Sequence, residues 1–321
     1  MAACQLCDVV HPGEPEECPE RRTGETVAGK YLVGALLGVG GMAAVYSARH
    51  AVLQRDIALK ILHKRYATDR ELSARIVREA RETAAMGHRA FVHVHDAGVT
   101  EDGCAFIEME SLDGRDLHSI RKTDGALEPG RVVQIAIAVL DGLEALHARG
   151  VIHRDIKSSN IYLSPGPDGR DQVKLLDLGF AKVEDELKLT AKNQLLGTPF
   201  YISPEQYIDP TAVDARSDLF SLGVVMFEVL TAKWPYSYVS KKELLSKVVK
   251  GELERHPARQ RPELPGWLDL IVAKALAHDR EQRFASATEM KAALERATMP
   301  EPAKPGLLRR LFGRTKPPAN A

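Results

Sequence analysis

The stretch VIHRDIKSSNIYLS, residues 151–164, holds a compact group of charged and amide side chains between apolar flanks. Twenty-two residues after Asp155 comes Asp177, in LLDLGFAK, and GTPFYISPE follows at residues 197–205. One such cluster can arise by chance, so its meaning depends on the motifs that accompany it. The polar group itself consists of His153, Arg154, Asp155, Lys157 and Asn160.

A glycine loop lies upstream, in LLGVGGMAAVY at residues 36–46. A dinucleotide fold would need a helix after the glycines, but the following AAVYSARH alternates as a strand does. A P-loop would need Gly-Lys-Ser/Thr, which is absent from this loop. The remaining interpretation is a glycine hairpin folded over phosphates, with Lys60 fifteen residues after Val45.

Hydrophobic periodicity divides the rest of the chain into two parts. Short apolar alternations over residues 31–62 predict antiparallel strands, and residues 69–87 repeat at helical spacing up to Gly87. Residues 91–110 predict two strands with a turn at Asp102-Gly103. Beyond residue 115 the pattern is mainly helical, with helices expected at 128–150, 217–232, 241–250, 266–278 and 286–296.

Taken in order, these motifs resemble those of the Hanks-type (eukaryotic-like) bacterial serine/threonine protein kinases. The resemblance covers residues 30–296 and implies an α+β, bilobal protein kinase fold. It has a small antiparallel-sheet N-lobe with one helix and a larger, mainly helical C-lobe. The expected bounds are 30–109 for the N-lobe, 110–114 for the hinge and 115–296 for the C-lobe.

The resemblance assigns catalytic roles that the chemistry supports. Asp155 would orient the acceptor hydroxyl and take its proton late, and Lys157 would place a cation at the transferring phosphate. Lys60 would hold the α- and β-phosphates, oriented by an ion pair from Glu79; Glu82 is the rival for that pairing. Mg²⁺, with Mn²⁺ as an alternative, would be held by the oxygen ligands of Asn160 and Asp177.

The resemblance also implies an ATP site between the lobes. Met109 would be the gatekeeper, and the backbone at Glu110 and Leu112 would meet the adenine edge. Two residues depart from the family pattern: Ala43 replaces a third glycine, and Leu178 replaces the usual phenylalanine after Asp177. The expected ATP-binding residues are Leu37, Gly38, Val39, Gly40, Gly41, Val45, Ala58, Lys60, Met109, Glu110 and Leu112.

The type of residue that accepts the phosphate and the site of regulation are inferred from the same resemblance. Lys157 and Thr198 follow the serine/threonine pattern. We expect autophosphorylation at Thr190, with Arg154 and Lys182 gathering around the phosphate. Structural roles are expected for Glu205 and Arg283, as a buried ion pair, and for Asp218, as an anchor of the central helix.

Both ends of the chain differ in composition from the middle. Residues 1–28 are expected to form a Cys-containing head. In it, Cys4, Cys7 and Cys18 are either part of a zinc ribbon, with His11 as the fourth ligand or with a degenerate site, or reduced cysteines. Residues 297–321 are basic and Pro-rich, and we expect them to form a flexible tail. Its segment 306–314 is expected to be free, with contact to an anionic membrane or a partner groove as the alternative.

Global properties exclude some classes of function. Forty-four basic residues balance forty-four acidic ones, so there is no electrostatic signature of nucleic-acid binding. No apolar run approaches the roughly 20 residues that span a bilayer, and MAACQLCDVV lacks the features of a signal peptide. The prediction is therefore a cytoplasmic enzyme that acts on protein substrates.

Two other functions remain as alternatives to an active Ser/Thr kinase. A pseudokinase scaffold would bind nucleotide and partners without phosphotransfer, but the full set of catalytic side chains disfavours it. A small-molecule phosphotransferase is disfavoured by GTPFYISPEQ at 197–206, which in the family serves to dock a peptide. The oligomeric state does not follow from the sequence.

Overall fold

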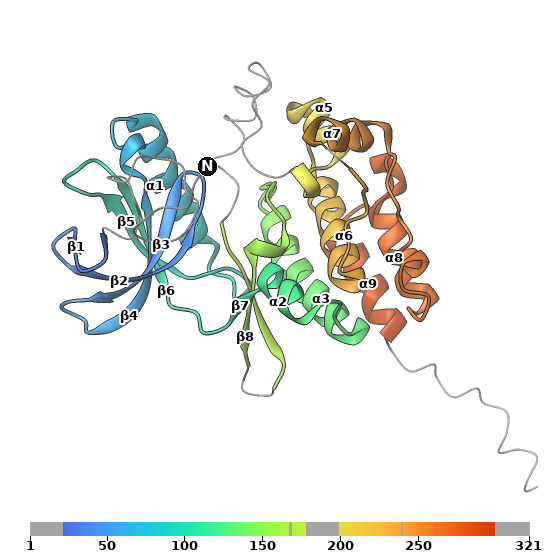
Figure 1. Cartoon of the computed structure of the whole chain (residues 1–321), viewed down its shortest axis with the longest axis horizontal. Helices are drawn as coiled ribbons and strands as arrows, with labels where there is room; N and C mark the ends of the chain where they lie inside the picture. The colour runs from blue at the N-terminus through green and yellow to red at the C-terminus, as the bar shows by residue number, and fades with distance from the viewer. Residues whose placement is uncertain (1–21, 167–168, 178–198, 239, 299–321) are drawn as a thin grey trace, which may run out of the picture.

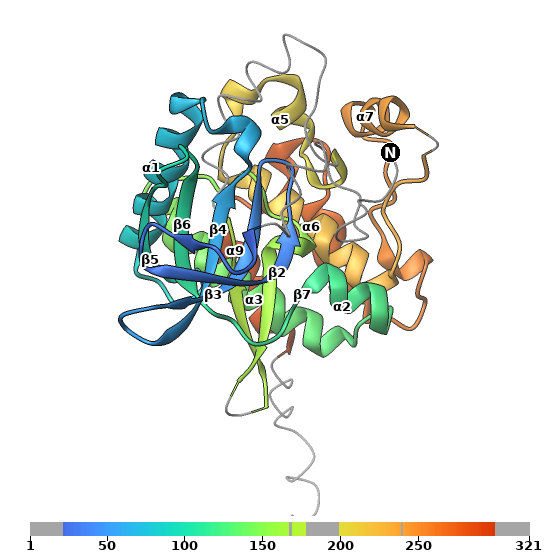
Figure 2. The same cartoon turned by 60° about the vertical axis from the view of Figure 1, so that its left-hand side comes forward.

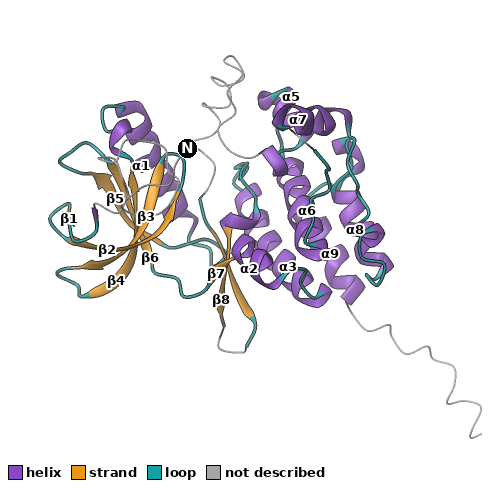
Figure 3. Cartoon of the chain, in the orientation of Figure 1, coloured by secondary structure: helices purple, strands orange, loops and turns teal. Residues whose placement is uncertain are grey.

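The computed structural model describes residues 22–166, 169–177, 199–238 and 240–298, which form two lobes (Figure 1). The predicted α+β bilobal arrangement is confirmed: an antiparallel sheet with one long helix precedes a mainly helical lobe (Figure 3). Each lobe has its own cluster of buried apolar side chains. The candidate site therefore lies between two separately packed bodies.

The N-lobe sheet has the strand order β1-β2-β3-β4-β6-β5, and all neighbouring strands are antiparallel. Gly103 has a φ of 84°, and a Cβ there would lie 2.8 Å from the Ala67 carbonyl oxygen, so the predicted turn at Asp102-Gly103 requires glycine. The strands are β1 (Thr26–Val27), β2 (Tyr31–Val39), β3 (Ala43–His50), β4 (Arg55–Leu62), β5 (Val94–Val99) and β6 (Ala105–Glu110).

The first strand corrects the boundary of the predicted head. Thr26 and Val27, placed in residues 1–28 by composition, pair with β2, and Val27 is buried in the N-lobe core. Arg22 adds an ion pair to Asp102 at 2.9 Å. A two-residue strand is too short to produce an alternation, which is why the sequence pattern did not reveal it.

One helix, α1 (Arg70–Met86), packs against β5 and β6 of the N-lobe sheet (Figure 2). The Asp69 side chain accepts a hydrogen bond from Leu72 N and caps the first turn, and Gly87 ends the helix with a φ of 56°. Its buried residues include Leu72, Ile76 and Ala80, which share one face at helical spacing.

The C-lobe is built around α6, in which every residue from Ser217 to Thr231 is buried. A small antiparallel sheet, β7-β8-β9, which the periodicity did not predict, borders the N-lobe. Its strands are β7 (Arg115–Asp116), β8 (Ile161–Pro165) and β9 (Asp171–Leu175). The helices are α2 (Leu117–Asp124), α3 (Pro129–His147), α5 (Pro204–Ile208), α6 (Ala215–Thr231), α7 (Lys241–Lys250), α8 (Gly266–Ala275) and α9 (Ala287–Thr298).

Candidate active site

One face of the N-lobe sheet collects five of the eleven residues predicted to bind ATP. Gly38 on β2 pairs with Val45 on β3, and Val45 pairs in turn with Lys60 on β4. Two residues before Lys60, Ala58 pairs with Met109 on β6. Directly opposed residues, and residues two apart on one strand, point to the same side of a sheet. These five positions therefore share one face.

The remaining predicted residues lie around this face. Leu112 packs, partly buried, against the same N-lobe cluster as Val45 and Ala58, whereas Leu37 is exposed near the end of β2. At the tip of the glycine loop, the Gly40 carbonyl oxygen accepts a hydrogen bond from His63 Nε2 at 2.9 Å. Arg65 donates similarly to the Gly41 carbonyl. The loop tip is thus held by the segment that follows β4.

An ion pair connects the two lobes across the site. Lys60 Nζ lies 2.6 Å from Asp177 Oδ1, although 117 residues separate them in sequence. Burial by itself would lower the pKa of Lys60, but attraction to Asp177 and to Glu79 outweighs it and raises that pKa. The pKa of Asp177 is lowered, because Lys60 outweighs the cost of burial. Both groups therefore stay charged at neutral pH.

Of the two candidate partners on α1, Glu79 is among the main causes of the raised pKa of Lys60. It is the second carboxylate, after Asp177, to stabilise the charged form of the lysine, whereas Glu82 is not among the main causes of that pKa shift. Glu79 is only partly buried on α1. The electrostatics therefore agree with the choice of Glu79 over Glu82.

Hydrogen bonds join Asp155 to Lys157 and to Asn160. Asp155 Oδ2 accepts hydrogen bonds from Lys157 Nζ at 2.9 Å and from Asn160 Nδ2 at 3.0 Å. Asn160 Nδ2 also donates to the backbone carbonyl of Asp155 at 3.0 Å. Because its amide nitrogen is used in this way, Asn160 presents its oxygen on the opposite side.

Asp218, at the start of α6, holds the backbone of this segment. Its two carboxylate oxygens accept hydrogen bonds from His153 N at 2.9 Å and Arg154 N at 2.8 Å. His147 Nε2 lies 2.7 Å from the same carboxylate. Arg154 has a left-handed φ of 62°, and Asp177 one of 49°, conformations that cost roughly 1–2 kcal/mol for residues other than glycine. Such strain persists where surrounding contacts enforce it.

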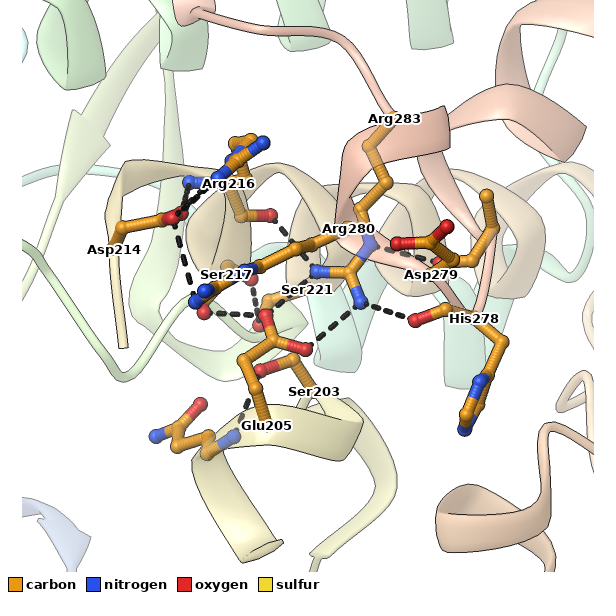
Figure 4. Close-up of polar contacts among 12 residues, drawn as sticks. Ser203, Glu205, Asp214, Arg216, Ser217, Ser221, His278, Asp279, Arg280 and Arg283 are labelled. Atoms are coloured by element: carbon orange, nitrogen blue, oxygen red, sulfur yellow. Dashed lines mark hydrogen bonds and ion pairs between the residues drawn. The ribbon is translucent and has the colours of Figure 1, made fainter. Parts of the chain in front are cut away.

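A second ion pair joins α5 to the segment before α9 (Figure 4). Arg283 Nη1 and Nη2 reach the two oxygens of Glu205 at 2.6 and 2.8 Å, which makes the pair bidentate. Ser217 Oγ donates to Glu205 Oε1 at 2.6 Å. The guanidinium also donates to the carbonyls of Ala277, Arg216 and His278.

Comparison with known proteins identifies this arrangement. The model of the protein kinase domain matches residues 31–294, well over half of the chain. The chain belongs to the protein kinase family. Among the described residues of this kinase domain, no group of three or more His, Cys, Asp or Glu side chains forms a metal cluster, and no helix is long and apolar enough to cross a membrane.

Bacterial relatives support this assignment to the protein kinase family. The chain is 38% identical over 278 residues to serine/threonine-protein kinase pkn3 of Myxococcus xanthus, covering 85% of this chain and 50% of pkn3. It is 37% identical to serine/threonine-protein kinase PknB of Mycobacterium tuberculosis, covering 85% of this chain and 44% of PknB. The chain thus spans about half the length of these curated relatives.

A solved kinase structure shares the fold. The kinase domain of PknI from Mycobacterium tuberculosis superposes with a TM-score of 0.64 at 28% sequence identity. The match covers 85% of this chain and 98% of the PknI chain. The head, residues 1–28, and the tail, residues 297–321, lie outside the residues 31–294 that the family model matches.

The structure adds a buried polar network in the kinase domain that sequence reasoning missed. Tyr201 OH donates to Glu228 Oε2 at 2.8 Å and lies 2.7 Å from Ser158 Oγ, two residues before Asn160. Arg121 Nε lies 2.9 Å from Glu228 Oε1. Burial raises the pKa of Glu228 despite these partners. No local pattern signals the network, because its members come from four separate segments.

Several predicted residues lie outside the described part of the kinase chain. In the activation segment these are Thr190, Thr198 and Lys182, together with Leu178. The head residues Cys4, Cys7, His11 and Cys18 and the tail segment 306–314 are likewise not described. Arg154 is described: it is partly buried, and its Nη1 lies 3.5 Å from the Pro210 carbonyl oxygen.

Proposed function

We propose that this protein is a serine/threonine protein kinase that transfers the γ-phosphate of ATP to hydroxyl groups of protein substrates. The observation that carries the proposal is the ion pair between Lys60 and Asp177, which joins the lobes at 2.6 Å beside the Asp155 segment. A phosphotransferase needs cations and oxygen ligands on the phosphates next to a carboxylate that orients the acceptor. All three kinds of group meet here.

In the proposed reaction, Asp155 orients the acceptor hydroxyl and takes its proton as the new P–O bond forms. The bond from the γ-phosphorus to the bridging oxygen breaks, and ADP leaves. Lys157, held against Asp155 at 2.9 Å, neutralises charge on the transferring group, and Lys60 holds the remaining phosphates. Glu79 orients Lys60.

A divalent cation, Mg²⁺ or Mn²⁺, fits the donor set. The Asn160 oxygen faces away from Asp155, since Nδ2 is used by that residue, and Asp177 uses Oδ1 for Lys60, which leaves Oδ2 for a ligand. Amide and carboxylate oxygens are the ligands that Mg²⁺ prefers. When bound, the cation would neutralise phosphate charge. Because the proposed reaction uses ATP, we also propose a cytoplasmic location.

Regulation is proposed at the activation segment. Phosphorylation of Thr190 would add an anion that Arg154 and Lys182 could pair with. Thr198 belongs to the serine/threonine signature rather than to this switch. Peptide mapping of active enzyme should find phosphate on Thr190; unmodified Thr190 in fully active protein would contradict the proposal.

The central experiment compares wild type with Asp155→Asn and Lys60→Met in transfer of labelled γ-phosphate from ATP to casein. Wild type should label casein, and both variants should lose most of the rate, because Asp155 orients the acceptor hydroxyl and Lys60 holds the phosphates that remain on the nucleotide. Circular dichroism establishes that the variants fold. Equal labelling by all three proteins, or none by wild type, would overturn the kinase proposal.

A further inference from the structure

The carboxylate of Glu110, the last residue of β6, joins the hinge to Lys174 on β9 and to the backbone of His93, just before β5. Glu110 Oε1 accepts hydrogen bonds from Lys174 Nζ at 2.7 Å and from the backbone N–H of His93 at 2.8 Å. The Glu110 N–H in turn donates to the His93 carbonyl at 2.9 Å. Side chain and backbone of Glu110 are thus both held, immediately before the connection from β6 to β7.

Lys174 approaches this carboxylate from the other lobe. It lies on β9, and its ammonium group also donates to the Phe91 carbonyl at 3.3 Å. The Lys174 side chain is only 12% exposed, and that of Glu110 28%. An ion pair so shielded from water is screened less than a surface pair, and removing either partner leaves the other poorly solvated.

The residues after Lys174 are fixed just as closely. Leu175 N donates to the Ala90 carbonyl at 2.6 Å, and the Leu175 carbonyl accepts from Val92 N at 3.1 Å. Leu176 N donates to the Asn160 carbonyl at 2.9 Å, and Asp177 follows directly. Lys174 and Leu175 are therefore hydrogen-bonded to residues 90–93, and Leu176, the residue before Asp177, is hydrogen-bonded to Asn160.

We propose that the Lys174–Glu110 ion pair positions the hinge backbone, and with it the adenine ring, at a set distance from Asp177. Lys174 acts through Glu110 and is a positioning residue for nucleotide binding. The inference rests on the proposed kinase function, in which the backbone at Glu110 and Leu112 meets adenine. Beyond that function, the inference is that the hinge at Glu110 and Asp177, at the phosphate end of the site, are connected through hydrogen bonds and the short segment 174–177.

The test uses Lys174→Met, Glu110→Gln and the charge-swapped double variant Lys174→Glu/Glu110→Lys. The swap keeps the backbone that would contact adenine and restores opposite charges. Affinity for adenosine and for ATP is measured by calorimetry, and KM for ATP, KM for casein and kcat by phosphate transfer. Adenosine lacks phosphates, so its affinity reports on the hinge alone.

Lys291→Met is the matched control. Lys291 pairs with Asp141 between α9 and α3, and both side chains are about one-fifth exposed. This variant should lower the melting temperature to a similar extent as Lys174→Met. It should leave the adenosine affinity unchanged, because Lys291 pairs with Asp141 and Glu144 in the C-lobe, and Asp141 keeps its separate pair with Arg89 in the variant.

We expect Lys174→Met and Glu110→Gln to weaken adenosine binding and raise KM for ATP by about ten-fold, the scale of one charge-assisted hydrogen bond. KM for casein should stay constant. The charge swap should restore part of the affinity, because it restores opposite charges, whereas a lysine at position 110 cannot accept from His93 N–H and a glutamate at position 174 cannot donate to the Phe91 carbonyl. Glu110→Gln keeps the shape of the side chain, so it tests the pair even if Lys174→Met fails to fold.

Two results would overturn the inference. One is an unchanged adenosine affinity in a folded single variant whose melting temperature falls like that of Lys291→Met. The other is a folded charge-swapped protein that binds adenosine no better than the singles. Absence of phosphate transfer by wild type would instead overturn the proposed kinase function, and the adenosine comparison would still decide on the positioning role.

Discussion

Ala43 stands at the base of the glycine loop, where β3 begins opposite Leu62. Its carbonyl oxygen accepts a hydrogen bond from Gly40 N at 2.8 Å, and its methyl group is buried. Ala43 is absent from the residues with positive φ in the described part of the chain. The backbone therefore does not require a third glycine at this position, and the departure from the family pattern introduces no strain.

Replacing Ala43 by glycine should consequently weaken the fold rather than repair the loop. We expect a loss of roughly 0.5–1 kcal/mol in the free energy of unfolding, because glycine in a strand adds freedom to the unfolded chain. KM for ATP should change no more than a few-fold. Urea denaturation and steady-state kinetics measure both quantities. Complete loss of activity would show that the methyl group has a role in the loop.

Local chemistry explains which single residues could be predicted. Lys60, Asp155 and Asp177 stand in short motifs, and the structure brings Lys60 and Asp177 into contact. Lys174 could not be predicted in the same way, because its partner Glu110 is 64 residues away and neither residue belongs to a polar motif. Interactions between distant segments depend on packing, which periodicity does not encode.

At the scale of elements, the length of a helix or strand determined whether the sequence predicted it. The 17 residues of α1 repeat at helical spacing between a cap and a stop, so both ends were predictable. The two residues of β1, and the two of β7, cannot show a period. The strands β8 and β9 have five residues each, too few for a clear period next to the helical pattern of the C-lobe, so the sheet β7-β8-β9 was missed although β9 lies just before Asp177.

The cap of α1 offers a prediction at this scale, since α1 carries Glu79. Asp69→Ala removes the acceptor for Leu72 N and should cost about 1 kcal/mol of stability. Fraying of the first turn should also raise KM for ATP as temperature increases, because Glu79 would orient Lys60 less firmly. Thermal unfolding measures the stability, and steady-state kinetics between about 15 and 40 °C measure KM for ATP. These temperatures lie below the usual melting temperatures of mesophile domains.

Ser240→Ala is the control for that experiment. Ser240 caps α7 in the same manner, accepting from Glu243 N at 3.2 Å, but α7 lies in the C-lobe away from Lys60. A similar loss of stability without a change in KM for ATP is expected. If both variants alter KM equally, the effect of Asp69 acts through global stability and not through α1.

At the scale of the whole molecule, ion pairs join segments that are distant in sequence, both between the two lobes and within the C-lobe. The Lys60–Asp177 pair spans the lobes, and the Glu205–Arg283 pair joins parts of the C-lobe 78 residues apart. Arg283 is fully buried and its guanidinium stacks on Phe220, with 4.8 Å between the guanidinium carbon and the ring centroid. A charge so placed depends on its carboxylate partner, because water cannot replace it.

The Glu205–Arg283 pair should give the molecule a specific dependence on acid. Burial alone would raise the pKa of Glu205, but the hydrogen bonds and charge of Arg283 lower it below the usual value. The stability that this carboxylate contributes is therefore present above about pH 4.3, the ordinary glutamate pKa, and is lost as pH falls through the lower folded pKa. Glu205→Gln should cost about 3 kcal/mol at pH 7.

Urea denaturation of wild type and Glu205→Gln from pH 7 to pH 3.5 measures this contribution, since other acids titrate equally in both proteins. The gap in unfolding free energy should narrow below about pH 4.3, where the unfolded wild-type chain takes up a proton that the native state still excludes. Glu281→Gln, which breaks an exposed pair with Arg216, should cost less than about 1 kcal/mol and show little such narrowing. A gap between wild type and Glu205→Gln that stays constant over the whole range would mean that the bidentate pair does not lower the pKa of Glu205, and that Arg283 is held chiefly by the backbone carbonyls around it.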